Sequence, residues 1–129
     1  WIRMRIGYLS SRLWTSYQSV GQLVSEYASD QAAIEQVFVG KSVSSALKLG
    51  HARGAAMLAI AQAGIALGEY APRSIKQEVA GTGAADKVQV QEMVVTLLKL
   101  NRAPAADAAD ALAIALCHAF NDNSYARVL

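Results

Sequence analysis

The chain has 129 residues, of which 53% are hydrophobic and 17% are charged, and its formal net charge at pH 7 is +2. This composition suits one folded domain with an apolar core and excludes an intrinsically disordered polymer. A charge this small does not by itself indicate nucleic-acid binding, and a single cysteine excludes a disulfide framework.

Apolar periodicity predicts strands that alternate with helices in the first half of the chain. Residues 1–6 have the alternation of an edge strand, and residues 11–28 have the spacing of a helix with one apolar face. A short buried strand is predicted over residues 32–38. Ser42 is then placed to cap a long helix that continues to about residue 66.

The second half continues the alternation. Residues 66–72 are predicted to form a short strand that ends at Pro72. The segment 72–81 begins with proline and ends with glycine, which is typical of a short helix. Two further helices and a fraying tail are expected over residues 84–100, 106–120 and 121–129. Alternating strands and helices indicate an α/β layered domain.

No stretch is typical of a membrane anchor or a secretory signal. The longest alanine-rich run, residues 54–68, is about five residues short of a bilayer crossing and contains Gln62. The first residues, WIRMRIGYLS, lack the continuous apolar core of a signal peptide. We therefore expect a soluble, cytoplasmic protein in which Cys117 is a small buried apolar residue in a reducing compartment.

Three carboxylates stand in otherwise apolar surroundings. Glu35 interrupts the predicted strand AAIEQVF, and charges in core strands are seldom buried without a partner or a metal. Asp107 and Asp110 lie one helical turn apart on one face of a nearly apolar helix. One interpretation is helix capping and a favourable helix dipole, which explains Asp107 better than Asp110. The alternative is a site for Mg²⁺, in which bound ions activate water for phosphodiester cleavage.

Four blocks of sequence resemble one protein family. The blocks AIEQVFVGKSVSSALKLGHARGAAM, EYAPRSIKQEVAGTGAADKVQVQEMV, TLLKLNRAP and ADAADALAIALCHA occur in the order and at the intervals found in the bacterial RuvC Holliday junction resolvases. The resemblance runs from about residue 11 to about residue 120. It implies a ribonuclease-H-like mixed sheet flanked by helices, with residues 1–129 forming a single nuclease domain. It also implies a homodimeric endonuclease that nicks four-way DNA junctions in recombination and repair, beside a branch-migration complex.

The same resemblance assigns roles to particular residues. Glu35 matches a glutamate metal ligand, and Asp107 and Asp110 match two C-terminal aspartate ligands. The implied cofactor is Mg²⁺, for which Mn²⁺ can substitute, and hydrolysis would use a metal-activated water without a covalent intermediate. Lys76 and Lys87 match basic residues near the DNA backbone, and their alternative is an ordinary solvated helix lysine.

Other positions have weaker matches. Phe38 matches an aromatic residue that can stack on an unpaired base at the crossover, and its alternative is core packing. Lys41 and Arg73 are candidates for phosphate contacts and are otherwise surface charges. The long glycine- and alanine-rich helix is expected to contribute to the dimer as well as to pack on its own sheet. His51 and His118 are expected to be structural.

The sequence departs from the family at its start. Family members begin with a strand that carries a GIDPG-type motif, whose aspartate is the first metal ligand, whereas no acidic residue precedes Glu26 here. The chain is therefore expected to be N-terminally incomplete relative to the family, with weakened metal binding and severely impaired cleavage. Two function classes stay open, a junction-resolving nuclease and a non-catalytic junction-binding fragment or pseudoenzyme. The lack of a phosphate-cradling glycine motif, a Cys/His metal spacing or a nucleophile elbow argues against a metabolic enzyme.

Overall fold

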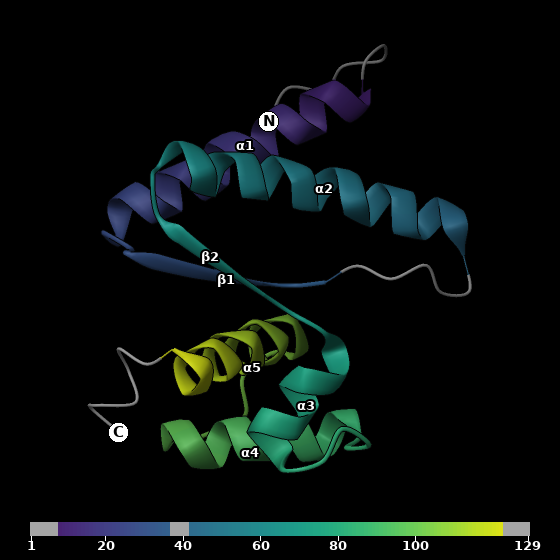
Figure 1. Cartoon of the computed structure of the whole chain (residues 1–129), viewed down its shortest axis with the longest axis vertical. Helices are drawn as coiled ribbons and strands as arrows, with labels where there is room; N and C mark the ends of the chain where they lie inside the picture. Colours follow the sequence, from purple (N-terminus) through teal and green to yellow (C-terminus); the bar gives the residue numbers. More distant parts are fainter. Residues whose placement is uncertain (1–7, 37–41, 123–129) are drawn as a thin grey trace. The chain divides into compact units, whose positions relative to one another are not determined.

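The computed structural model describes residues 8–36 and 42–122 (Figure 1). Its elements in chain order are α1 (Tyr8–Glu26), β1 (Gln31–Glu35), α2 (Val43–Gln62), β2 (Ala66–Tyr70), α3 (Pro72–Ala80), α4 (Lys87–Leu98) and α5 (Ala106–Asn121). The two strands are paired in a small parallel sheet and are connected by α2. The predicted α/β class is therefore confirmed, while the strand expected at residues 1–6 lies outside the described residues.

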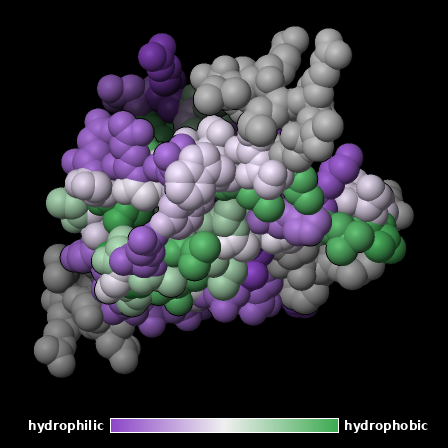
Figure 2. All heavy atoms as spheres, turned by 90° about the horizontal axis from the view of Figure 1, so that it is seen from above, coloured by the Kyte–Doolittle hydropathy of each residue, from purple (hydrophilic) through white to green (hydrophobic). Residues whose placement is uncertain are grey.

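The described chain divides into two compact units. Residues 8–32 and 42–67 form one unit, and residues 33–36 and 68–122 form the other. In the first unit α1 packs along α2, and the rings of Trp14 and Tyr17 stack with their centroids 5.5 Å apart. Large apolar side chains of both helices remain exposed, and apolar surface is visible among polar side chains in Figure 2. Within the described ranges, no helix has the length and apolar character needed to cross a membrane.

Residues next to α2 in the sequence determine where this helix begins and ends. The hydroxyl of Ser42 accepts a hydrogen bond from the Ser45 backbone N–H at 3.2 Å, so the predicted cap is confirmed. The helix ends at Gln62, before the predicted end near residue 66. The chain turns there, because Gly64 adopts a φ of +74°, a conformation that glycine reaches without strain.

The helices that follow β2 also begin and end at identifiable signals. Pro72 is at the start of α3 and Gly81 follows its end in the left-handed region, as predicted. The next helix, α4, begins at Lys87 and not at residue 84. The side chain of Asp86 accepts from the Gln89 N–H at 2.9 Å, and the Gln89 side chain accepts from the Asp86 N–H at 2.8 Å. This reciprocal cap corrects the predicted helix start, because Asp86 is the N-cap residue and the helix begins after it.

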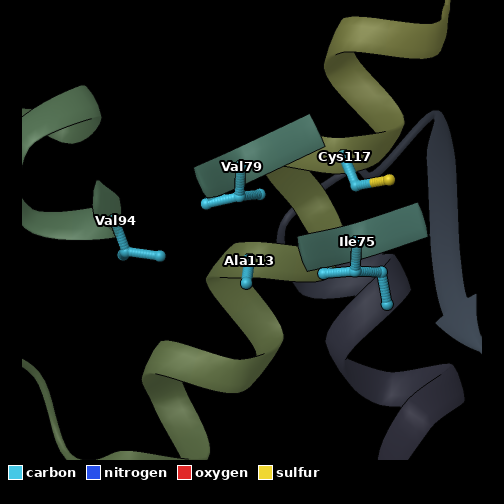
Figure 3. Packing of buried hydrophobic residues seen from close by; sticks show 5 residues of the cluster. All are labelled: Ile75, Val79, Val94, Ala113 and Cys117. Carbon is cyan, nitrogen blue, oxygen red and sulfur yellow. The ribbon is translucent and has the colours of Figure 1, made fainter. Parts of the chain in front are cut away.

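The core of the second unit lies where α3, α4 and α5 meet. The buried cluster there consists of Ile75 and Val79 of α3, Val94 of α4, and Ala113 and Cys117 of α5, and Figure 3 labels these five side chains on their helices. Cys117 is fully buried, which raises its pKa to about 11, so it remains a neutral thiol at pH 7. The prediction that this cysteine is a small buried apolar residue is confirmed.

The end of β2 is attached to the last turns of α5. The Tyr70 hydroxyl lies 2.5 Å from Nδ1 of His118, and Nε2 of the same histidine lies 3.8 Å from Oδ2 of Asp122. A Cβ atom at position 68 would lie 2.6 Å from His118 Nδ1, so Gly68 leaves the space for this contact. His118 thus joins two elements of one unit, in agreement with its expected structural role.

The boundaries of the remaining helices and strands differ slightly from the predicted ones. The first helix spans residues 8–26 where residues 11–28 were predicted, and β1 spans residues 31–35. The last helix includes Asn121, whose side-chain amide donates to the Cys117 carbonyl at 2.8 Å. The predicted tail of residues 121–129 therefore starts too early, and residues 123–129 lie outside the described part of the chain.

Candidate active site

A pocket of about 300 Å³ opens on the unit formed by residues 33–36 and 68–122. Its lining comes from the end of β1, from α3, from the start of α4 and from α5. The apolar lining includes Ile75, Val90, Ala113 and Ile114. The charged residues that line it are Glu35, Lys76, Asp86, Lys87 and Asp110. The pocket thus brings together four residues that the sequence marked for one site, Glu35, Lys76, Lys87 and Asp110, although they lie far apart in the sequence.

Glu35 is the last residue of β1. The next residue, Gln36, donates its backbone N–H to the Tyr70 carbonyl at 2.8 Å, which ties this strand end to β2. Although Glu35 is solvent-exposed as a residue, desolvation of its carboxyl group raises its pKa. The negative charge of Asp110 raises the pKa further, and the positive charge of Lys76 opposes it. The three side chains therefore act on one another electrostatically within the pocket.

The two aspartates of α5 have different surroundings. Asp107 lies in the first turn, where a negative charge interacts favourably with the helix dipole. The N-cap residue is Ala105, and no side chain caps this end, so Asp107 does not cap the helix and only the dipole part of that interpretation holds. Oδ2 of Asp110 lies 3.5 Å from Nζ of Lys87, and both side chains are more than half exposed. An exposed pair of this kind contributes less than about 1 kcal/mol to the free energy of folding. Its relevance is that it places a lysine and a carboxylate side by side in the pocket.

The basic candidates separate into two groups. Lys76 is half-buried on α3 and Lys87 is the first residue of α4, and both line the pocket. Arg73 lies on α3 but is not among the lining residues. Its side chain packs over the loop after α3, since a Cβ atom at Gly83 would lie 2.7 Å from Cγ of Arg73. Among the predicted residues, Asp107 also lies outside the lining of this pocket.

Two of the predicted DNA contacts, Phe38 and Lys41, lie outside the described residues. Sequence reasoning also missed one residue of the pocket, Asp86. The signal was present, because an aspartate followed three residues later by a glutamine just before an apolar run is the pattern of a capping box.

The donors in the pocket suit a hard divalent cation. Glu35 and Asp110 supply carboxylate oxygens, and the pKa of Glu35 is raised in part by the charge of Asp110, a repulsion that a cation would relieve. Asp107 is one helical turn from Asp110. Within residues 8–36 and 42–122, no three His, Cys, Asp or Glu side chains form a metal-binding group. The two carboxylates that line the pocket are of the kind that Mg²⁺ binds, and water or substrate oxygens commonly complete its coordination.

The raised pKa of Glu35 predicts a pH-dependent stability. Because the folded protein holds this proton more tightly than the unfolded chain, the free energy of unfolding falls as the pH rises above 4.5. We expect Glu35→Gln to raise the Tm of the metal-free protein at neutral pH by about 1–2 °C, a small effect since the carboxylate is exposed. Well below pH 4.5, where the carboxyl group is protonated in both states, we expect no difference.

Thermal unfolding in EDTA at the two pH values measures this effect. Glu92→Gln, an exposed position of α4, is the matched control and should leave the Tm unchanged. A lower Tm for Glu35→Gln at neutral pH would contradict the assignment of an unfavourable negative charge to this position.

Comparisons with known proteins identify the relatives of the chain. Residues 1–118 match the family model described as crossover junction endodeoxyribonuclease RuvC. The protein of that name from Marinobacter nauticus is 54% identical over 93% of this chain and 69% of its own length. The corresponding protein from Teredinibacter turnerae is 52% identical over 93% of this chain and 68% of its own length.

Solved structures agree with these sequence matches. The structure of Thermus thermophilus RuvC in complex with a Holliday junction substrate has a TM-score of 0.84 and 35% identity, covering 98% of this chain and 74% of that one. A second Thermus thermophilus RuvC structure has a TM-score of 0.81 and 34% identity, covering 98% of this chain and 75% of that one. The expected ribonuclease-H-like α/β fold is confirmed by these neighbours.

Proposed function

The chain belongs to the RuvC family of crossover junction endodeoxyribonucleases, and from this premise we propose that it resolves four-way (Holliday) DNA junctions by phosphodiester hydrolysis. The reaction class is that of a hydrolase that acts in DNA recombination and repair. The observation that carries the proposal is the pocket in which two carboxylates, Glu35 and Asp110, are combined with two lysines, Lys76 and Lys87. Phosphodiester cleavage needs both anionic ligands for a cation and cationic groups for the phosphate.

We assign the acidic residues of the site to a divalent cation. Family members are metal-dependent nucleases, and the proposed ion is Mg²⁺, with Mn²⁺ as a substitute. Glu35 and Asp110 would hold it from the pocket. We propose Asp107, on the turn of α5 that precedes Asp110, as a third ligand on the family resemblance alone, since it lies outside the pocket lining and the described side chains form no group of three. When bound, such an ion supplies an activated water and stabilises the leaving oxygen.

The lysines act on the phosphate. A DNA strand that enters the pocket brings a negatively charged phosphate beside Lys76 and Lys87, and both ammonium groups stabilise the charge that develops during cleavage. The ion pair between Lys87 and Asp110 is exposed and weak, so the lysine can exchange its carboxylate for phosphate at little cost. We also assign backbone or base contacts to Phe38, Lys41 and Arg73.

We further propose that the protein works as a homodimer. A symmetric pair of cuts on a four-way junction needs two sites, and the exposed apolar side chains of α1 and α2 offer surface for self-association. Trp14 is 59% exposed and Leu58 is 62% exposed. The family match covers residues from both compact units, which supports the proposal that they belong to one nuclease domain. We also propose that the protein is cytoplasmic and that it acts together with a branch-migration complex.

A second candidate is a module that binds junctions without cutting them. It is favoured by the finding that the described residues include no group of three side chains able to hold a metal ion. Under this reading the pocket lysines contact phosphate, and the carboxylates only shape the local electrostatic field.

One experiment separates these functions. A labelled four-way junction and a linear duplex of matched sequence are incubated with the protein in Mg²⁺ or EDTA, then run on native and denaturing gels. The proposed nuclease gives symmetric nicks in the junction only, and only with Mg²⁺. A retarded but intact junction would favour the binding module, and equal treatment of junction and duplex would contradict both.

A further inference from the structure

One side chain holds the loop between α3 and α4. Nε2 of Gln77 donates to the Gly81 carbonyl at 3.0 Å, and its Oε1 accepts from the Gly83 N–H at 3.2 Å. Both ends of the amide group are thus bonded to the backbone of the same loop. Within that loop the Ala84 N–H also donates to the hydroxyl of Thr82 at 3.2 Å. The loop therefore has a defined conformation, and two of its backbone groups have the Gln77 side chain as their hydrogen-bond partner.

The residues that follow this loop line the pocket. Ala85 is 3% exposed and lines the pocket together with Asp86 and Lys87. Asp86 caps α4, and the next residue is Lys87, whose Nζ lies 3.5 Å from Oδ2 of Asp110. Between Gly83 and Lys87 the chain is bonded, buried or capped at successive residues. A change in the conformation of the loop is therefore expected to move Lys87, the first residue of α4.

We infer that Gln77 is a positioning residue that sets the location of Lys87 in the junction-cleaving site. Gln77 is exposed on α3 and does not line the pocket, so it acts through the loop and not by contact with the reacting phosphate. The inference rests on the proposed function, because it concerns the phosphate-binding role of Lys87. Each hydrogen bond of this kind favours the ordered loop by a factor of about two to ten.

The test is a double-mutant cycle between positions 77 and 87. Gln77→Met retains a long unbranched side chain with good helix propensity and removes both hydrogen bonds. Gln91→Met on α4 is the matched control, since the described structure gives the Gln91 side chain no hydrogen bond to lose. Single-turnover cleavage of a labelled junction and junction affinity are measured for the unsubstituted protein, Gln77→Met, Lys87→Ala and the double variant, with the Tm of each.

We expect Gln77→Met to slow cleavage about five- to tenfold with less than a twofold change in affinity. In the Lys87→Ala background the same substitution should change the rate less than twofold, because the group that it positions is gone. Gln91→Met should match the unsubstituted protein. Equal factors in both backgrounds would overturn the inference, since they would show that Gln77 acts independently of Lys87.

The design separates this inference from the proposed function. If the unsubstituted protein binds the junction but does not cut it, the same four proteins are compared by the salt dependence of junction binding. Lys87→Ala should then reduce, by about one, the steepness with which the logarithm of the binding constant falls with the logarithm of the salt concentration. Gln77→Met must then reduce the slope only when Lys87 is present, and any other pattern overturns the inference. If the unsubstituted protein neither binds nor cuts a junction, the proposed function fails and the inference fails with it.

Discussion

Asp110→Asn is expected to slow cleavage of a four-way junction by about a thousandfold while leaving junction binding unchanged or slightly tighter. The amide has the size of the carboxyl group but no negative charge, so it binds a divalent cation poorly. The substitution also removes the partner of Lys87, whose Nζ lies 3.5 Å away, and leaves that ammonium group available to phosphate. Loss of a carboxylate charge beside DNA lowers the repulsion of the strand.

Single-turnover cleavage and junction affinity, measured on the same preparations, check both halves of this prediction. Asp30→Asn makes the same chemical change at an exposed position outside the pocket and should leave rate and affinity as they are. Mg²⁺ should raise the Tm of the unsubstituted protein more than that of Asp110→Asn, because the ion stabilises only a folded state that binds it. An unchanged cleavage rate would contradict the assignment of Asp110 as a ligand.

Val94→Ala is expected to lower the free energy of unfolding by about 2 kcal/mol, through the loss of buried methyl groups and the cavity left behind. Val94 is fully buried and belongs to the cluster in which α3, α4 and α5 meet. These helices carry Lys76, Lys87 and Asp110, so the packing that stabilises the unit also holds the lining of the pocket in place.

The comparison within one helix makes this prediction specific. Val88→Ala removes the same atoms from α4 at a residue that is 60% exposed, and it should cost less than about 0.5 kcal/mol. Urea unfolding at fixed temperature measures both, with an unchanged m-value required for the comparison. Equal losses for the two variants would mean that the cluster around Val94 does not stabilise the unit.

Local signals in the sequence determined much of the secondary structure. Ser42 caps α2, and α3 runs from Pro72 to Ala80 with Gly81 after it, because capping and left-handed turns depend on neighbouring residues. Such interactions need no knowledge of distant parts of the chain. The predicted start of α4 at residue 84 is wrong although its signal is equally local, since Asp86 and Gln89 form a capping box that begins the helix at Lys87.

The resemblance to the RuvC family also came from the sequence alone, and it marked Glu35, Asp110, Lys76 and Lys87 for a single site. Only the tertiary structure decided that these side chains line one pocket and that Asp107 lies outside its lining. Periodicity cannot decide this, because a helical face shows which residues share a side but not what that side meets.

The electrostatics and the loop geometry likewise depended on the fold. The pKa of Glu35 is raised by desolvation and by Asp110, a residue on another element far along the chain. The role of Gln77 depends on where the backbone groups of Gly81 and Gly83 point, which follows from the left-handed turn at Gly81. The sequence by itself determined the family, the start of α2, both ends of α3 and the candidate residues. The tertiary structure decided which candidates meet, because desolvation and charge interactions act between atoms that only folding brings close.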